Sequence, residues 1–330
     1  MKKILFATTA LVATAGMAAA EVTLGGFGRF GLYYEENNDA TVGNDETRIE
    51  QRFRLTVTGT AESDNGLKFE GRIRFQTDDQ GNGNSNLAQQ AAAGFAVTSG
   101  GFRLDVGNVS DVIDSGDVVD YYGFGVGLTS FAEQSSAFNG VPASGFGTTN
   151  EIDNDETPEV IPTIKLRYTA GDFTVSASYT DGTSVQDTGA GTATELEEWQ
   201  SGVGYSFGNY SVGAAFGNEE TTDVTATTST VTLDNDFWVV SFGGELGAFA
   251  FSILVGDSDV NDDTMYGFSV KYDIGAVTDI RFVFSDSGVD GEDEVVALGF
   301  RHGLGGGVSL RGGIGQNTAG NTQADLGVIF

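Results

Sequence analysis

Residues Ile164 to Tyr179 form two runs in which every second residue is apolar, joined by a turn at Ala170 to Asp172. Side chains alternate between the two faces of a strand, so Leu166 and Val175 lie on an apolar face while Lys165 lies on a polar one. Most of the chain repeats this pattern. A hairpin that is apolar on one side and polar on the other must meet two different environments, and identifying them decides the fold.

Residues 1–20 show the three parts of a secretory signal peptide. Two lysines precede a short, mostly apolar stretch, and an Ala-x-Ala cleavage site ends at Ala20. An anchoring helix is the alternative, but it needs about 20 strongly apolar residues, and threonines interrupt this run. We therefore expect an exported protein whose mature chain is residues 21–330. No later segment has the composition of a membrane-spanning helix, so a membrane role must rest on strands.

The composition favours strands joined by tight turns. The 330 residues include 49 Gly, only 3 Pro and no Cys, and 39% are hydrophobic. Many glycines with few prolines suit short turns and uninterrupted strands. Because no disulfide can form, stability must come from a ladder of hydrogen bonds or from a core. Helical globular folds fit this composition poorly.

The chain is strongly acidic, with a net charge of −31. Without the two lysines of the expected signal peptide, 14 basic residues remain against 47 acidic ones, which gives −33. This excludes nucleic acid as a partner, because phosphate contacts need clustered Lys and Arg on an accessible face. A disordered acidic chain is the other class with such a charge, and the persistent alternation argues against it.

About sixteen segments carry the alternating pattern, and short connections alternate with long ones. When short connections lie at one end of the strands and long ones at the other, the strands form an up-and-down antiparallel meander. A sheet of so many strands is expected to close into a barrel without free edges. The lumen is then too wide for side chains to fill, so the apolar face must point outward into lipid. We therefore predict an all-β fold, a 16-stranded antiparallel up-and-down transmembrane β-barrel. A soluble β-sandwich or β-solenoid with an aromatic core is the alternative.

The connection at residues 108–162 interrupts the rhythm of short strands and turns. Loops of this length in compact domains are usually functional or disordered. It contains apolar pieces such as Val118-Val119, many acids, and no Lys or Arg. We expect it to fold into the barrel as a constriction loop rather than to extend over the surface. Which of its acids face the lumen is left open, and those from Asp153 onward are candidates for an outward direction. The acids expected at the constriction are Asp111, Asp114, Asp117 and Asp120.

Half of the mature basic residues fall on the polar face of three early strands, and a further arginine is expected to extend them. Pairing with local acids such as Glu50 and Glu70 is the structural explanation, and part of this pairing is expected. Opposite an acidic loop, a basic wall would create a transverse field across a water-filled constriction. This predicted wall comprises Arg29, Arg48, Arg52, Arg54, Lys68, Arg72, Arg74 and Arg103.

Five segments carry a family resemblance: EVTLGGFGRFGLYY, YSFGNYSVG, YGFSVKYDIGA, LGGGVSLRGGIG and ADLGVIF. With them the mature chain resembles the general diffusion porins of alphaproteobacteria, the Rhodobacter-type porins. The resemblance implies a trimeric sixteen-stranded barrel whose third long loop folds into the pore and faces an arginine-rich wall. It assigns Arg29, Arg52, Arg54, Arg72 and Arg74 to this wall. The Pro-Glu-Phe loop tip of enteric porins is absent, and residues 130–150 are instead rich in Gly, Ser and Ala.

Two other signals are weaker. His302, the only histidine, sits at a strand end and favours a structural position, although an outer-membrane hydrolase with a Ser and His pair is the enzymatic alternative. Asp257, Asp259 and Asp262 resemble the start of a calcium loop, but Asp262 and Phe268 occupy the positions where an EF-hand has Gly and Glu. A solvated acidic loop is the better interpretation. We expect no cofactor and leave loosely bound Ca²⁺ as an alternative.

The sequence therefore predicts a passive diffusion channel of the Gram-negative outer membrane for small hydrophilic solutes and ions, with a weak preference for cations, and no enzyme. Expected partners are lipid, lipopolysaccharide and two further copies of the chain. A channel selective for an anionic or sugar ligand at the arginine wall is the alternative, and an adhesion barrel without a pore is a third. Small outward residues mark the expected trimer contact: Gly26, Gly28, Gly71 and Ala324.

Overall fold

The computed structural model describes residues 21–79, 81–146, 161–187, 192–225, 227–261 and 263–330. The expected signal peptide and residues 147–160 of the long loop lie outside these ranges. The described residues form a single antiparallel sheet and one short 3₁₀ helix, η1, at Asn38–Ala40. The strands are β1 Glu21–Glu35, β2 Thr47–Glu62, β3 Lys68–Asp78, β4 Gln89–Gln90, β5 Gly94–Ser99, β6 Phe102–Gly107, β7 Thr163–Ala170, β8 Phe173–Asp187, β9 Thr192–Phe207, β10 Tyr210–Val224, β11 Ser229–Leu246, β12 Phe249–Ser258, β13 Met265–Asp273, β14 Thr278–Asp286, β15 Val295–Gly305, β16 Val308–Gln316 and β17 Thr322–Ile329.

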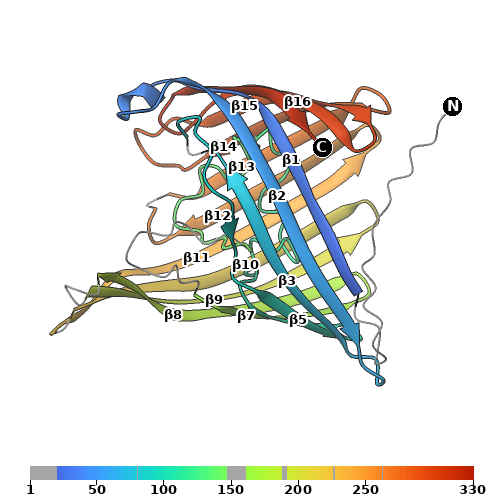
Figure 1. The fold of residues 1–330 in the computed structure, drawn as a ribbon, viewed down its shortest axis with the longest axis vertical. Helices are drawn as coiled ribbons and strands as arrows, with labels where there is room; N and C mark the ends of the chain where they lie inside the picture. Colours follow the sequence, from blue (N-terminus) through green and yellow to red (C-terminus); the bar gives the residue numbers. More distant parts are fainter. Residues whose placement is uncertain (1–20, 80, 147–160, 188–191, 226, 262) are drawn as a thin grey trace.

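The sheet closes on itself (Figure 1), because β1 pairs with β2 on one side and with β17 on the other. Apart from β4 and β5, consecutive strands pair with each other, which is the up-and-down order. The short strands β4 and β5 both pair with β3 and together occupy one position in the barrel. The barrel therefore has sixteen strand positions, and the predicted 16-stranded antiparallel fold is confirmed. Closure leaves no free strand edge to pair with another chain.

The outer surface is apolar, as the alternation predicts. Large side chains of one parity remain exposed on the isolated chain, including Leu24 at 68% and Phe30 at 56%. Aromatic rings lie close together beside the short turns, for example Phe102 and Tyr168, whose centroids are 4.4 Å apart. Such a ring of aromatics is typical of the interfacial girdle of membrane barrels. Among the described residues, no helix is long and apolar enough to cross a membrane.

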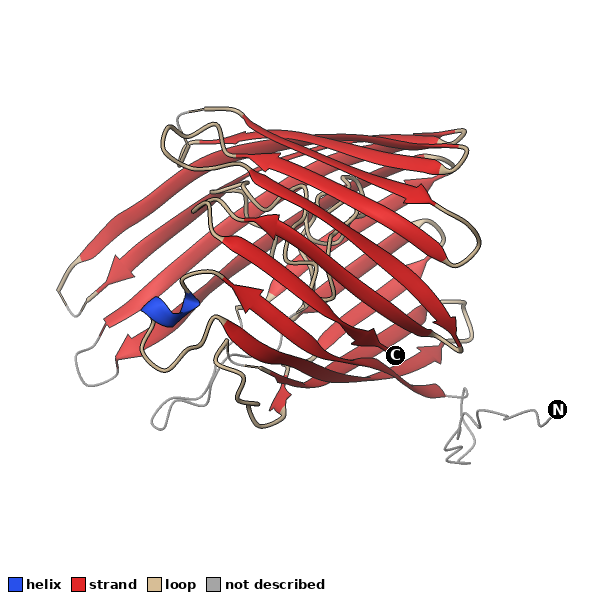
Figure 2. Cartoon of the chain, turned by 90° about the horizontal axis from the view of Figure 1, so that it is seen from above, coloured by secondary structure: helices blue, strands red, loops and turns tan. Residues whose placement is uncertain are grey.

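The described part of the long loop, residues 108–146, lies inside the barrel, where Figure 2 shows it as tan coil surrounded by red strands. Its apolar residues form two buried clusters with inward side chains of β10 to β15. The inside of the barrel therefore has two unlike parts. One wall supports the loop, and the other faces what remains of the lumen.

Candidate functional site: the constriction inside the barrel

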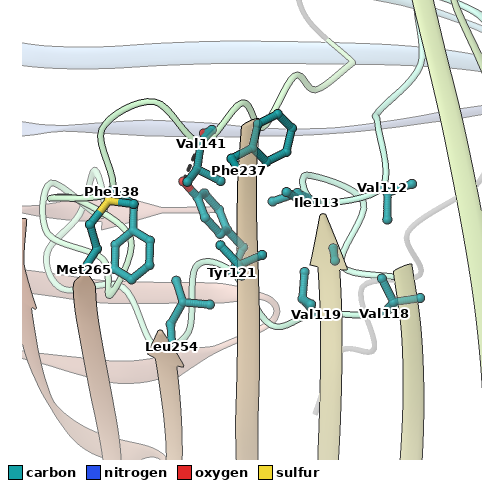
Figure 3. Packing of buried hydrophobic residues seen from close by; sticks show 12 residues of the cluster. Val112, Ile113, Val118, Val119, Tyr121, Phe138, Val141, Phe237, Leu254 and Met265 are labelled. Carbon is teal, nitrogen blue, oxygen red and sulfur yellow. Dashed lines mark hydrogen bonds between the residues drawn. The ribbon is translucent and has the colours of Figure 1, made fainter. Parts of the chain in front are cut away.

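The wall that supports the loop is apolar or small on its inner side. In Figure 3, Tyr121 of the loop lies beside Leu254 of β12, and Val118 and Val119 of the loop belong to the same buried cluster, together with Phe237 of β11. Fully burying a Val or Leu side chain contributes roughly 1.5–3 kcal/mol. The loop is thus held by a core of its own, which the barrel completes.

Two glycines on this wall let the loop backbone approach closely. A Cβ at Gly213 of β10 would overlap the carbonyl oxygen of Val118, and one at Gly267 of β13 would overlap that of Gln134. Glycine is the residue that permits such contact between two backbones. These two positions therefore fix the depth at which the loop lies on the wall.

Serine hydroxyls on the same wall receive the backbone N–H groups of the loop. The N–H of Asp120 donates to Ser241 Oγ at 2.9 Å, and the N–H of Ala137 donates to Ser285 Oγ at 3.0 Å. On β13, Ser269 Oγ accepts from Phe124 N at 3.0 Å. A buried N–H group without a partner is costly. These serines therefore provide the hydrogen-bond acceptors that the irregular loop backbone needs inside the barrel.

The far turn of the loop is held by one carboxylate. Asp325 of β17 accepts hydrogen bonds from the N–H groups of Leu128 at 2.8 Å and Thr129 at 2.9 Å, and from the Thr129 hydroxyl at 2.9 Å. The Asp325 side chain is buried. Three donors converging on one carboxylate form a strong anchor.

Most arginines of the predicted wall form ion pairs with neighbours on the same wall. Arg29 pairs with Glu50 at 2.5 Å and Arg52 pairs with Asp78 at 2.7 Å. Arg48 pairs with Asp79 at 3.0 Å, and Arg103 pairs with Asp105 at 2.9 Å and Glu70 at 3.2 Å. The pairing with Glu50 and Glu70 that the sequence suggested is therefore present. The positive charges of these arginines are therefore largely neutralised by acids on the same wall.

Three arginines of the wall differ from the others. Among the described residues, no carboxylate forms an ion pair with Arg54, Arg72 or Arg74. Arg72 and Arg74 lie over the ring of Phe146, 4.2 and 4.7 Å from its centroid, and Arg74 also donates to the Phe146 carbonyl oxygen. The loop thus reaches the basic wall at Phe146. We call Arg54, Arg72 and Arg74 the eyelet arginines.

The four predicted loop acids have different surroundings. Asp114 is half-buried, accepts a hydrogen bond from the Tyr122 hydroxyl at 2.7 Å, and lies close enough to attract Arg72 and Arg74. Asp120 is exposed. These two acids are therefore the described loop acids that face open space or the eyelet arginines.

Asp111 and Asp117 serve the loop itself. Asp111 is fully buried, and burial raises its pKa to about 7 although the N–H groups of Asp114 and Ser144 donate to it. Asp117 forms ion pairs with Lys165 at 2.9 Å and Arg167 at 2.5 Å. Although burial acts in the opposite direction, the hydrogen bonds from these two cations hold the pKa of Asp117 below its ordinary value.

The remaining predicted site residues lie away from the constriction. Lys68 is exposed at the short-turn end of β3, opposite Glu62, and is thus apart from the eyelet arginines. Asp257 and Asp259 stand on the outward parity near the long-loop end, where Thr264 Oγ1 donates to Asp257 at 3.2 Å. Asp262 lies outside the described residues.

Two further sets of side chains could form a catalytic or metal site by their residue types, but they already have partners within the chain. His302 accepts or donates a hydrogen bond with Thr278 Oγ1 at 2.7 Å, and that contact is structural. Glu50, Asp78 and Asp79 bring carboxylate oxygens within 4.8 Å of one another in the described part of the chain. Each of these carboxylates already forms an ion pair with an arginine, so the geometry provides no vacant acidic site there.

Sequence reasoning missed a second group of lumen arginines, Arg281, Arg301 and Arg311, on β14 to β16. All three have the inward parity, but they are spread along the sequence and only the strand register brings them together. It also missed the inner wall under the loop. The signal was available: the runs Phe237–Val240 and Val295–Leu298 are apolar on both parities, as strands buried on both faces are.

A closed barrel with an apolar outside and a lumen narrowed by an inserted loop defines a β-barrel channel. A family model described as Gram-negative porin matches residues 7–322. The porin of Fuscovulum blasticum is 30% identical over 321 residues, which cover 94% of this chain and 99% of that protein. The porin of Rhodobacter capsulatus is 27% identical over 335 residues with the same coverage.

The solved structures agree. A triple mutant of the Rhodopseudomonas blastica porin superposes with a TM-score of 0.71 at 25% identity, covering 94% of this chain and 99% of that one. The chain therefore belongs to the Gram-negative porin family and forms a barrel channel, and the predicted resemblance to Rhodobacter-type porins is confirmed.

Proposed function

We propose that the protein is an outer-membrane porin through which small hydrophilic solutes and ions diffuse passively, with a weak preference for cations. The observation that carries this proposal is the arrangement at the constriction. Among the described residues, no carboxylate forms an ion pair with the eyelet arginines, and Asp114 of the inserted loop is close enough to attract two of them. Such opposed charges orient dipolar solutes and disfavour apolar ones.

The preference for cations follows from the total charge. The mature chain carries 47 acidic residues against 14 basic ones, and most basic residues are balanced within the barrel by neighbouring acids. The mouths and long loops therefore have a negative potential, which raises the local concentration of cations. The short-turn end is taken as periplasmic and the long-loop end as external.

The oligomer is proposed to be a trimer whose contact includes the face of β1 to β3 and β17. Exposed apolar side chains on this face support the contact, among them Leu32 at 59% and Phe53 at 57%. Gly28 and Gly71 stand on the same face, close to the rings of Phe330 and Phe95. The remaining outer surface is proposed to meet lipid and, at the external end, lipopolysaccharide.

Planar bilayer recording of the purified protein tests this function. A general pore gives stepwise, ohmic conductance that rises with salt concentration without saturating, and a reversal potential in a KCl gradient that favours K⁺. A channel selective for a ligand at the arginine wall would instead be blocked by that ligand. A silent bilayer in the presence of folded protein would contradict the proposal and favour an adhesion barrel.

A further inference from the structure

A second basic cluster lies in the lumen, away from the eyelet arginines. It consists of Arg281, Arg301 and Arg311 on three adjacent strands, β14, β15 and β16. Arg301 stands directly opposite Arg311 in the strand register, and the charge of Arg281 is close enough to repel both. Like charges directly opposite each other destabilise a sheet pair, so their placement calls for a compensating anion.

The described residues supply little compensation. Arg281 forms an ion pair with Asp279 at 2.6 Å, whereas neither Arg301 nor Arg311 forms one with a described carboxylate. Nε of Arg301 is buried and has no hydrogen-bond partner. Within the described ranges, Arg311 donates one hydrogen bond, from Nε to Ser309 Oγ at 3.1 Å. Arg301 therefore has a buried donor without an acceptor, and Arg311 has only a neutral one.

The loop above the cluster does not neutralise it. The Gly125 carbonyl oxygen accepts from Arg281 at 3.4 Å and from Arg301 at 3.3 Å, but a carbonyl carries no net charge. Glu133 faces Arg301 without forming an ion pair, and burial raises its pKa to about 7. At neutral pH this carboxyl is therefore only partly ionised.

The cluster opens into a hollow between the loop and the short-turn end of the barrel. The hollow is lined by Arg301, Arg311, Asp273, Asp279, Gly303 and Ser309, and by the turn at residues 275–278. Both carboxylates already have a cation partner, since Asp279 is held by Arg281 and Asp273 by Lys271. The guanidinium groups of Arg301 and Arg311 thus share one concave space, which is polar and reached from the short-turn side.

We propose that this hollow binds the phosphate group of small solutes on the short-turn side of the constriction. Arg281, Arg301, Arg311 and Lys271 stand against the carboxylates of Asp273 and Asp279 here, which leaves a net charge of +2 that matches the phosphate dianion. Guanidinium forks bind phosphate oxygens through paired, charge-assisted hydrogen bonds, and Ser309 adds a hydroxyl. The access of solutes to the hollow rests on the proposed channel function.

The test is titration of the detergent-solubilised protein with inorganic phosphate at constant ionic strength, followed by the ³¹P linewidth. Wild type should broaden the signal saturably. Arg311→Gln should weaken binding about tenfold, as expected for losing a charge-assisted contact. Arg311 is the chosen position because it forms no hydrogen bond with the described part of the loop, whereas Arg281 and Arg301 also donate to the Gly125 carbonyl oxygen.

Lys68→Gln is the matched control. Lys68 is exposed at the short-turn end of β3 and forms no ion pair with a described carboxylate. This variant removes one positive charge from the same end of the barrel without changing the residues that line the hollow. It should bind phosphate within twofold of wild type. Acetate, a monoanion, should compete weakly.

Three results would overturn the site: no saturable broadening by wild type, equal binding by Arg311→Gln, or equal loss in Lys68→Gln. Acetate binding as tight as phosphate would refute the charge match. Conductance of the same preparations in KCl separates this proposal from the channel function. Protein that conducts but does not bind phosphate contradicts only the site, and protein that binds phosphate but does not conduct contradicts only the channel.

Discussion

The two halves of the barrel interior are built by different sequence patterns. Strands β2 and β3 alternate strictly, with Arg54, Arg72 and Arg74 inward and Phe53 outward. Strands β11 and β15 are apolar on both parities, because their inner face is covered by the loop and their outer face is apolar as well. Strands with an alternating pattern therefore line the lumen with polar side chains, whereas stretches that are apolar on both parities are covered by the inserted loop.

The largest effect is expected from Gly213→Ala, which places a Cβ where the Val118 carbonyl oxygen lies. Overpacking of this kind costs about 1–3 kcal/mol, and it acts on the contact that seats the loop. The variant should lose amide protection in residues 118–121 and show a larger, noisier conductance. Gly303→Ala is the control, because the nearest atom to a Cβ there is 3.6 Å away. Equal behaviour of the two variants would refute the loop seat.

Asp325→Ala should loosen the far turn of the loop. It leaves the N–H groups of Leu128 and Thr129 without their acceptor, at about 1–3 kcal/mol for each buried donor. Hydrogen exchange at these two amides should accelerate while the strands stay protected. Thr129→Val removes only the hydroxyl contact and should give a smaller change of the same kind. A larger change in Thr129→Val than in Asp325→Ala would contradict the anchor.

The root of the loop should respond to pH through Asp111. Burial raises the pKa of this carboxyl from 3.8 to about 7, so its contribution to stability is complete below its ordinary pKa and is lost as pH rises through about 7. Amide protection of Ile113, corrected for intrinsic exchange, should fall over this range. Asp111→Asn should flatten the profile, and an unchanged profile in this variant would assign the dependence to another group.

The smallest effect is expected from Asp114→Asn on the loop side of the constriction. Removing this negative charge should lower the K⁺ over Cl⁻ permeability ratio modestly, because many other acids remain at the mouths. Asp223→Asn is a suitable control, since Asp223 lies at the long-loop end of β10 and contacts Thr194. Reversal potentials in a KCl gradient distinguish the two variants. An increase of the K⁺ over Cl⁻ permeability ratio in Asp114→Asn would contradict this prediction.

Sequence predicts the strands and the inward parity of Arg54 and Arg72 because both depend on a local period of two. It predicts the insertion of the loop because acids and buried-type aromatics occur together there. It does not predict that Asp111 is buried, since this depends on contacts with Gln200 and Ser144 far along the chain. Nor does it join Arg301 to Arg311, which requires the strand register.

The central claim is that the constriction lies between the eyelet arginines and the inserted loop. The most direct test is the reversal potential of the Arg54→Gln, Arg72→Gln, Arg74→Gln triple variant in a planar bilayer with a KCl gradient. The K⁺ over Cl⁻ permeability ratio should rise clearly above that of wild type, because the variant removes three positive charges that no carboxylate in the described part of the chain pairs with. An unchanged ratio in a folded, conducting variant would place the constriction elsewhere and contradict the account.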